Sequence, residues 1–236
     1  IVALIVAAGF SMNTMAAEFS FDRLGTGIGT GITPVGQLAW EQGLPSLSYS
    51  ESKDENGIKV RNTRLNADML LRTGLAKDLE LQLGWQGPSW SKTKTAGQSV
   101  EEDGLGDVSI GVKKASDLAD EKLSMAILAE AILATGNDGF SNHDDIYSLS
   151  SALAYAATDL INTSITMRYE VQNSNWAVTA VPTIEYQIAG KWSGFSVGSG
   201  VIYALNDRVQ MDASVGVDLN GKDKSYQSGL GVSFLF

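Results

Sequence analysis

The sequence predicts an all-β protein: a transmembrane, antiparallel up-and-down β-barrel of about 12 strands, with short periplasmic turns and longer extracellular loops. Three observations lead to this fold class. The chain begins with an apolar stretch typical of exported proteins, its apolar and polar residues alternate over long segments, and aromatic residues recur at both ends of the apolar faces. Glycine is frequent, at 25 of 236 residues, and cysteine is absent, which excludes disulfide scaffolds and thiolate sites.

The net charge and the histidine content argue against further classes of protein. The 17 Lys and Arg residues against 27 Asp and Glu residues give a net charge of −10. Because nucleic-acid binding needs a basic face, we expect no nucleic-acid partner. The chain has one histidine, which leaves little room for His-based metal sites or catalytic triads. We therefore expect no catalytic residues, no metal and no cofactor.

The N-terminal residues have the features of a secretory signal peptide whose n-region is missing. Ile1 to Phe10 carry no charge, and Ala16 and Ala17 supply a small-residue cleavage site. This stretch is too short for a transmembrane helix, which needs about 20 residues. We expect a signal peptide at residues 1–17, a periplasmic or lumenal N-terminal segment at 18–35 and an outer-membrane barrel at 36–236, which places the protein in the outer membrane of a Gram-negative bacterium.

Alternation of apolar and polar residues predicts the strands. In residues 79–85, Leu79, Leu81 and Leu83 share one face while Glu80 and Gln82 share the other. In chain order, comparable segments are 64–72, 107–113, 147–155, 164–171 and 209–219. Segments of 10 to 13 residues exceed the usual length of about 5–6 in soluble proteins and suit tilted membrane strands of about 9–11 residues. Their second faces are rich in small and polar residues, as in a barrel lumen.

The connections alternate in character and set the strand count. Tight turns are expected at 74–78, 157–159 and 205–208, and longer polar links at 50–57, 86–104, 136–145, 172–175 and 220–225. A first count gives eleven strands, but an even number is needed when both termini are periplasmic. Residues 192–203 must then fold back, at Gly198-Ser199-Gly200, which gives twelve.

Residues 117–135 are open to two interpretations. Their composition favours a helix by propensity. A strand also satisfies the pattern, with Ser124, Ala126, Leu128 and Glu130 facing inward, and we favour the strand.

Aromatic residues mark the two ends of the apolar faces. The expected girdle consists of Tyr147, Tyr155, Trp176, Tyr186, Tyr226 and Phe236. Pairs ten residues apart on a tilted strand cover roughly 23 Å of depth, close to the roughly 25 Å apolar band of membrane barrels.

Charged residues on the inward faces are the candidate functional residues. The expected pore-lining residues are Glu41, Arg64, Asp68, Arg72, Glu80, Asp107, Lys113, Glu130, Arg168, Glu170, Glu185, Asp212 and Asp218. Such groups either pair across the lumen or line water. Paired, they plug the barrel; hydrated, their acidic excess favours cations.

Several motifs, taken in order, resemble the family known as the "putative MetA-pathway of phenol degradation" outer-membrane proteins. They are Asp22-Arg23 before the glycine-rich 25–31, Gly104-Leu-Gly-Asp-Val108, Ala134-Thr-Gly-Asn-Asp138 and the final segment 229–236. The resemblance implies an outer-membrane barrel that moves hydrophobic or aromatic compounds and has no catalytic chemistry. The strand ending at Phe236 is similar to the terminal strand that the barrel assembly machinery reads.

We therefore expect an outer-membrane channel or transporter, not an enzyme, for passive uptake of small aromatic compounds or small cations through a narrow acidic lumen. Its expected partners are outer-membrane lipid, lipopolysaccharide, the assembly machinery and a small-molecule solute. Two alternatives stay open: a closed structural or adhesive barrel without transport, and an outer-membrane lipid hydrolase that uses His143.

Overall fold

The structure is a computed structural model that describes residues 21–22, 27–55, 57–118, 122–158, 161–188, 192–196, 199–218 and 224–236. The signal peptide predicted at residues 1–17 lies outside this part of the chain. The described part contains no helix that is long and apolar enough to cross a membrane.

The described residues form fifteen β-strands in one sheet. In chain order these are β1 (Leu38–Lys53), β2 (Lys59–Asn66), β3 (Met69–Ala76), β4 (Leu79–Trp85), β5 (Pro88–Thr95), β6 (Gln98–Leu105), β7 (Val108–Asp117), β8 (Leu123–Leu133), β9 (Ile146–Thr158), β10 (Ile161–Gln172), β11 (Asn175–Ile188), β12 (Trp192–Ser196), β13 (Ser199–Asn206), β14 (Val209–Asp218) and β15 (Lys224–Leu235).

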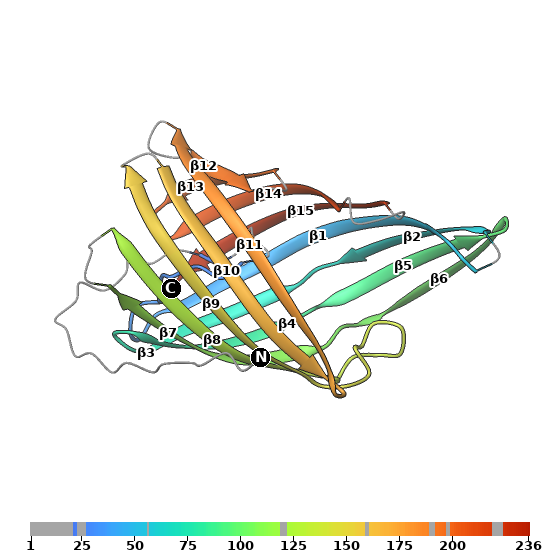
Figure 1. The fold of residues 1–236 in the computed structure, drawn as a ribbon, viewed down its shortest axis with the longest axis horizontal. Coiled ribbons are helices and arrows are strands. Elements are labelled where there is room, and N and C mark those ends of the chain that lie inside the picture. Colours follow the sequence, from blue (N-terminus) through green and yellow to red (C-terminus); the bar gives the residue numbers. More distant parts are fainter. Residues whose placement is uncertain are drawn as a thin grey trace.

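The sheet closes on itself as a barrel. Every pairing between strands is antiparallel, and β1 pairs with β15 from Ala39 to Glu51. On its other edge, β1 pairs with β3 through its first half and with β2 through its second half. Figure 1 shows the strands running side by side around this closed sheet. The predicted fold class, an antiparallel transmembrane β-barrel, is confirmed.

Three pairs of consecutive elements act as single strands. β2 and β3 lie end to end along β1 and together make one pass of the wall. On their other side, β4 and β5 lie end to end in the same way, with β4 beside β3 and β5 beside β2. β7 and β6 continue this pattern along β4 and β5. Within the described residues, the fifteen elements therefore make twelve passes of the wall, in agreement with the predicted number.

These three strands bend at the same level of the barrel. The breaks fall at 67–68, 86–87 and 106–107. Ala67 N–H donates to Pro88 O at 3.1 Å, and Gly106 N–H donates to Gly87 O at 2.9 Å. Gly87 has a φ of +75°, and a Cβ there would lie 1.8 Å from the Ala67 carbonyl oxygen, so only glycine fits this crossing.

Beyond the bends lies a four-stranded region that we call the loop-end extension: the second half of β1 from Ser46, with β2, β5 and β6 (Figure 1). The prediction of a polar link at 86–104 was wrong here, because residues 88–95 and 98–105 are strands joined by a turn at 96–97. Their Ser, Thr and Lys content hid them, because neither face of these two strands shows the apolar alternation that marks the other strands. The link expected at 50–57 is also shorter, because β1 continues to Lys53.

Both chain ends of the barrel lie at one end, here called the turn end. Leu38 N–H donates to Phe236 O at 3.2 Å, and Phe236 N–H donates to Leu38 O at 2.8 Å. The short connections after β3 and β13 lie at this end, as predicted. The opposite end, called the loop end, holds the connection 134–145 between β8 and β9.

Two ambiguous regions form strands. β8 pairs with β7 and β9 over its length, and its inward Ala126 and Leu128 are buried while Ile127 is exposed. The strand interpretation of this segment is confirmed. Residues 192–196 and 199–206 form the two strands β12 and β13, also as predicted, although Ser199 and Gly200 belong to β13 rather than to the turn.

The outer face of the barrel is apolar. In β10, Ile165, Met167 and Tyr169 are exposed while Thr166 between them is buried. Five of the expected girdle residues are exposed on this outer face: Tyr147, Tyr155, Trp176, Tyr226 and Phe236. The side chain of the sixth, Tyr186, lies outside the described part of the structure. Their role as a girdle stays a prediction.

Candidate functional site

An N-terminal strap, defined as the described residues 21–22 and 27–35, lies against the inner wall of the barrel. Thr30 Oγ1 and Ser124 Oγ share a hydrogen bond of 2.8 Å. Ile32 is buried in a cluster with Ala115 and Ala126. A Cβ at Gly27 would lie 2.6 Å from Thr166 Oγ1. The strap therefore occupies space between β7, β8 and β10 in the barrel interior.

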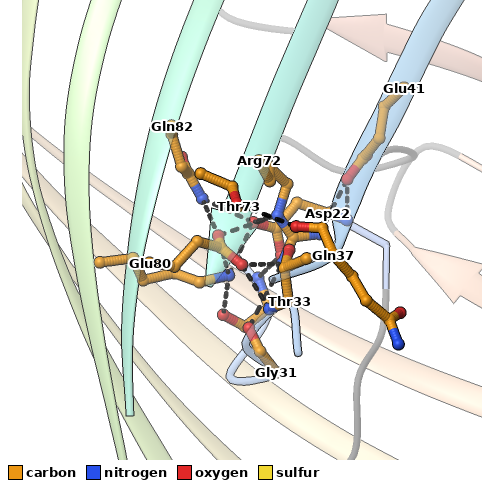
Figure 2. A network of polar contacts seen from close by, with 11 residues as sticks. Asp22, Gly31, Thr33, Gln37, Glu41, Arg72, Thr73, Glu80 and Gln82 are labelled. Carbon is orange, nitrogen blue, oxygen red and sulfur yellow. Dashed lines mark hydrogen bonds and ion pairs between the residues drawn. The ribbon is translucent and has the colours of Figure 1, made fainter. Parts of the chain in front are cut away.

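Arg72 links the strap to the wall (Figure 2). Its Nη1 donates to Glu41 Oε1 at 2.8 Å and its Nε to Glu80 Oε1 at 2.9 Å. Its Nη2 donates to the strap carbonyl of Gly31 at 3.3 Å. In return, the strap N–H of Thr33 donates to Glu80 Oε2 at 2.6 Å. One buried arginine thus holds three neighbouring strands and the strap together.

Asp22 adds a carboxylate from the strap itself. Its Oδ2 accepts from Lys113 Nζ at 2.8 Å and from Gln82 Nε2 at 3.1 Å, and it lies 3.5 Å from Arg72 Nε. Its Oδ1 accepts from Gly29 N–H at 3.0 Å. We call Asp22, Glu41, Arg72, Glu80 and Lys113 the charged cluster.

The charged cluster is almost inaccessible to water. Arg72, Glu80 and Lys113 have no exposed surface, and Glu41 has 1%. Charges in such a site are tolerated only when they are paired and hydrogen-bonded. The wall supplies two cations and two carboxylates, and the strap supplies the third carboxylate. The cluster can therefore hold the strap, but its charges do not line water.

A second charged group, which we call the hydrated group, is partly exposed to solvent. Arg168 on β10 donates to Glu130 on β8 at 3.0 Å and to Glu170 at 3.1 Å. The side chains of Arg168, Glu130 and Glu170 are 26%, 18% and 37% exposed. Ser148 donates to Glu130 at 3.5 Å. These residues face the interior toward the loop end, and part of each side chain stays accessible to solvent.

The connection 134–145 folds onto the barrel at the loop end. Asp107, which is buried, accepts from Gly136 N–H at 2.8 Å and from Asn142 N–H at 2.7 Å. Asn142 Nδ2 also donates to Asp107, at 2.9 Å. Gln172 Nε2 on β10 donates to Asn142 O at 2.8 Å. Asp107 thus anchors this connection rather than facing an open pore.

Phe140 is the buried residue of this connection, with 3% of its surface exposed. Its ring centroid lies 5.2 Å from Cζ of Arg64 on β2. A Cβ at Gly104 on β6 would lie 2.7 Å from Phe140 Cδ2. Phe140 therefore packs against the inner face of the loop-end extension, in contact with β2 and β6.

The structure distributes the expected pore-lining residues over several places. Four join the charged cluster (Glu41, Arg72, Glu80, Lys113), three form the hydrated group (Glu130, Arg168, Glu170), and Asp107 and Arg64 contact the connection 134–145. Asp212 is buried and Asp68 is half-buried. The side chains of Glu185 and Asp218 lie outside the described part. That these residues line a pore stays a prediction.

Sequence reasoning missed Asp22, Gln82, Phe140 and Asn142 as members of these sites. Asp22, Phe140 and Asn142 lie in the strap or in a connection, where no alternating pattern shows which way a side chain points. Gln82 was placed on the polar face, but an uncharged residue gave no reason to single it out. His143 is exposed in the connection 134–145. Among the described residues, no group of three or more His, Asp or Glu side chains could hold a metal ion.

Comparisons with known proteins agree with this architecture. A family model described as "Putative MetA-pathway of phenol degradation" matches residues 21–236. An outer membrane channel from Pseudomonas putida F1 has a similar structure, with a TM-score of 0.66 and 12% identity over 86% of this chain and 96% of that chain. The translocator domain of the autotransporter NalP from Neisseria meningitidis is also similar, with a TM-score of 0.52 and 10% identity over 91% of this chain and 90% of that one. No curated protein matches the sequence.

Proposed function

This chain belongs to the family described as "Putative MetA-pathway of phenol degradation", and from that premise we propose that it is an outer-membrane channel for passive uptake of small aromatic compounds, closed at the turn end by its N-terminal strap. The observation that carries this proposal is the contrast between two charged groups. The side chains of Arg168, Glu130 and Glu170 are 18–37% exposed, whereas Arg72, Glu80, Lys113 and Glu41 in the charged cluster are buried.

Two of the comparisons support this function. The family description names phenol degradation, and the Pseudomonas putida neighbour is described as an outer membrane channel. Short turns face the periplasm and longer loops face outward in such barrels. The strap would then close the periplasmic end, and a solute would enter from the loop end.

The strap has the properties of a removable plug. In the described residues, its backbone pairs with the wall at one isolated bridge, between Val35 and Gly74. The barrel ladder itself is continuous without the strap. The other strap contacts run through side chains, chiefly Asp22 to Lys113 at 2.8 Å. Moving the strap would therefore leave the wall intact.

The hydrated group supports a preference for cations. Two carboxylates, Glu130 and Glu170, face one guanidinium, Arg168. A water-lined passage with excess negative charge favours cations over anions. Outer-membrane lipid, lipopolysaccharide, a small-molecule solute and, through the strand ending at Phe236, the barrel assembly machinery are the partners we propose. We propose no catalytic activity.

A closed structural barrel is the second candidate, because every member of the charged cluster has an oppositely charged partner. A barrel built only for structure would keep this cluster closed permanently. The two candidates differ in whether displacement of the strap produces a conducting pore.

Replacing Gly74 separates them. A Cβ at Gly74 would lie 2.1 Å from the Thr33 carbonyl oxygen, so Gly74→Ala must push the strap away from β3. Gly216→Ala is the matched control, since a Cβ there meets nothing nearer than 3.9 Å. In planar bilayers, we expect Gly74→Ala to open more often than the unmodified protein, and Gly216→Ala to behave like it. A folded but silent Gly74→Ala barrel would favour the closed structural candidate.

A further inference from the structure

The inner face of the loop-end extension is polar and almost uncharged. Its residues share one face because β1, β2 and β5 pair in register there, in three rows across the strands. The rows are Ser46–Asn66–Ser89, Ser48–Arg64–Ser91 and Ser50–Asn62–Thr93. A Cβ at Gly229 would lie 2.9 Å from Ser46 Oγ and 3.3 Å from Ser214 Oγ, which places this face inward. Hydroxyl and amide groups therefore surround Arg64.

An aromatic ring already rests on this polar face. Phe140 places its ring 5.2 Å from the Arg64 guanidinium carbon and against the backbone of Gly104. Any side chain at Gly104 would collide with the ring, at 2.7 Å from Cδ2. Among the described residues, Arg64 forms no ion pair, so the ring is the partner that the structure gives its guanidinium. The inner wall therefore has a site that accommodates an aromatic ring, and Phe140 of the same chain occupies it.

We propose that the position held by Phe140 is a binding site for the ring of a phenol, which replaces Phe140 when the connection 134–145 moves away. This inference rests on the proposed function and names the solute class at the entrance of the channel. Phe140 then competes with the solute: it fills the site while the connection 134–145 lies on the barrel, and it leaves the site to an entering solute.

The chemistry of the site favours a phenol over a hydrocarbon. A guanidinium within about 6 Å of a ring centroid attracts the ring face. The surrounding serines and asparagines can exchange hydrogen bonds with a phenolic hydroxyl, which both the Phe140 ring and a hydrocarbon solute lack. Such sites reject the analogue that lacks the hydroxyl more strongly than apolar pockets do.

The site also disfavours aromatic carboxylates. Glu102 on β6 lies opposite Ser91 of β5, on the same inner face as Arg64. Its Oε2 comes within 3.2 Å of where a Cβ of Gly139 would be, next to Phe140. The carboxylate of an aromatic acid would be repelled by Glu102, which offsets its attraction to Arg64, whereas a neutral phenol meets no such repulsion.

The test is direct binding of 4-fluorophenol, followed by fluorine NMR, to the protein in lipid nanodiscs, with empty nanodiscs measuring uptake by lipid. Phe140→Ala vacates the site, so we expect it to bind 4-fluorophenol at least about fivefold more tightly than the unmodified protein. Adding Arg64→Gln should abolish this gain. Arg61→Gln is the matched control, because Arg61 lies on the same strand but is exposed and pairs with Glu51 on the outer face.

Fluorobenzene and 4-fluorobenzoate test the solute class and should bind Phe140→Ala several-fold more weakly than 4-fluorophenol. Binding of 4-fluorophenol equal to that of empty nanodiscs, insensitivity to Arg64→Gln, or equal binding of fluorobenzene would each overturn the proposal. Phe140→Leu, which still fills the space, should not show the gain. Each variant is first checked for the folded barrel by its heat-dependent migration on gels.

This outcome is separable from that of the proposed function. If Gly74→Ala conducts but no variant binds 4-fluorophenol, the channel stands and the ring site is wrong. If Phe140→Ala binds 4-fluorophenol but no variant conducts, the ring site stands and the channel is wrong.

Discussion

Arg72 is the residue on which the closed interior depends most. It has no exposed surface and touches Glu41, Glu80 and the strap. Its charge is expensive to bury, and the two neighbouring carboxylates offset that cost. If the arginine were removed, Glu41 would lose the cation that it contacts at 2.8 Å, and Glu80 would keep only Lys113, at 3.6 Å. Leaving a carboxylate buried without its close cation is far more costly than the loss of a surface ion pair.

We predict that Arg72→Met lowers the free energy of unfolding by about 3–5 kcal/mol. The measurement is urea unfolding in lipid vesicles, followed by tryptophan fluorescence. The control is Lys114→Met, which removes an exposed pair with Asp78 in the turn after β3. The hydrogen bond from Lys114 lowers the pKa of the Asp78 carboxyl, but exposed pairs add little stability. Equal losses for the two variants would contradict this account of the cluster.

Asp107 is the corresponding anchor at the loop end. We predict that Asp107→Asn frees the connection 134–145, because its carboxylate accepts two backbone N–H groups and the Asn142 amide. Charge-assisted bonds of this kind are worth about 1.5–3 kcal/mol, so amide exchange in 134–145 should accelerate by roughly tenfold or more. Asp103→Asn, on the exposed β6, is the control. Unchanged exchange in 134–145 would show that the connection is held by other contacts.

At the scale of elements, the pattern of alternation predicted strands wherever lipid contacts one face. β4 and β10 are examples, because each apolar residue there is followed by a polar or small one. The same rule failed at 86–104, since β5 and β6 show no apolar alternation on either face. It also failed for the strap: Asp22 and Thr33 belong to no strand, and their contacts come from distant residues.

The charged residues on the inner face also show what alternation cannot predict. Alternation placed Arg72 and Arg168 on the inner face alike, but it could not tell that one is buried and the other partly exposed. That difference arises because the strap covers Arg72 and leaves Arg168 uncovered, and no local pattern in the sequence encodes where the strap runs.

The bends give a prediction at this scale. Gly87→Ala should sharply reduce the folded fraction, because its Cβ would lie 1.8 Å from the Ala67 carbonyl oxygen where β4 passes into β5. Gly97→Ala shares the positive φ, +84°, but its Cβ would meet nothing within 4 Å, so it should cost only about 1 kcal/mol. The folded fraction on refolding into vesicles, read from gel migration, compares them. Similar yields would mean that the bend tolerates a shift of the backbone.

At the scale of the whole molecule, the barrel is a wall with two covers. The strap lies against the inner wall and is held by the charged cluster, and the connection 134–145 covers part of the loop end and is held by Asp107. Between them lies the hydrated group around Arg168. Neither cover belongs to the hydrogen-bonded strand ladder of the wall, so each can move without breaking that ladder. A gated channel requires such movement.

The most direct test of this account fixes the strap reversibly. Thr30 Oγ1 and Ser124 Oγ are 2.8 Å apart, so Thr30→Cys with Ser124→Cys places two thiols close enough for a disulfide in a chain that has no cysteine of its own. In single-channel recordings, the account predicts a silent oxidised protein, openings after reduction, and silence again after reoxidation. Conductance that is the same in both redox states, or a reduced protein that never opens, would contradict it.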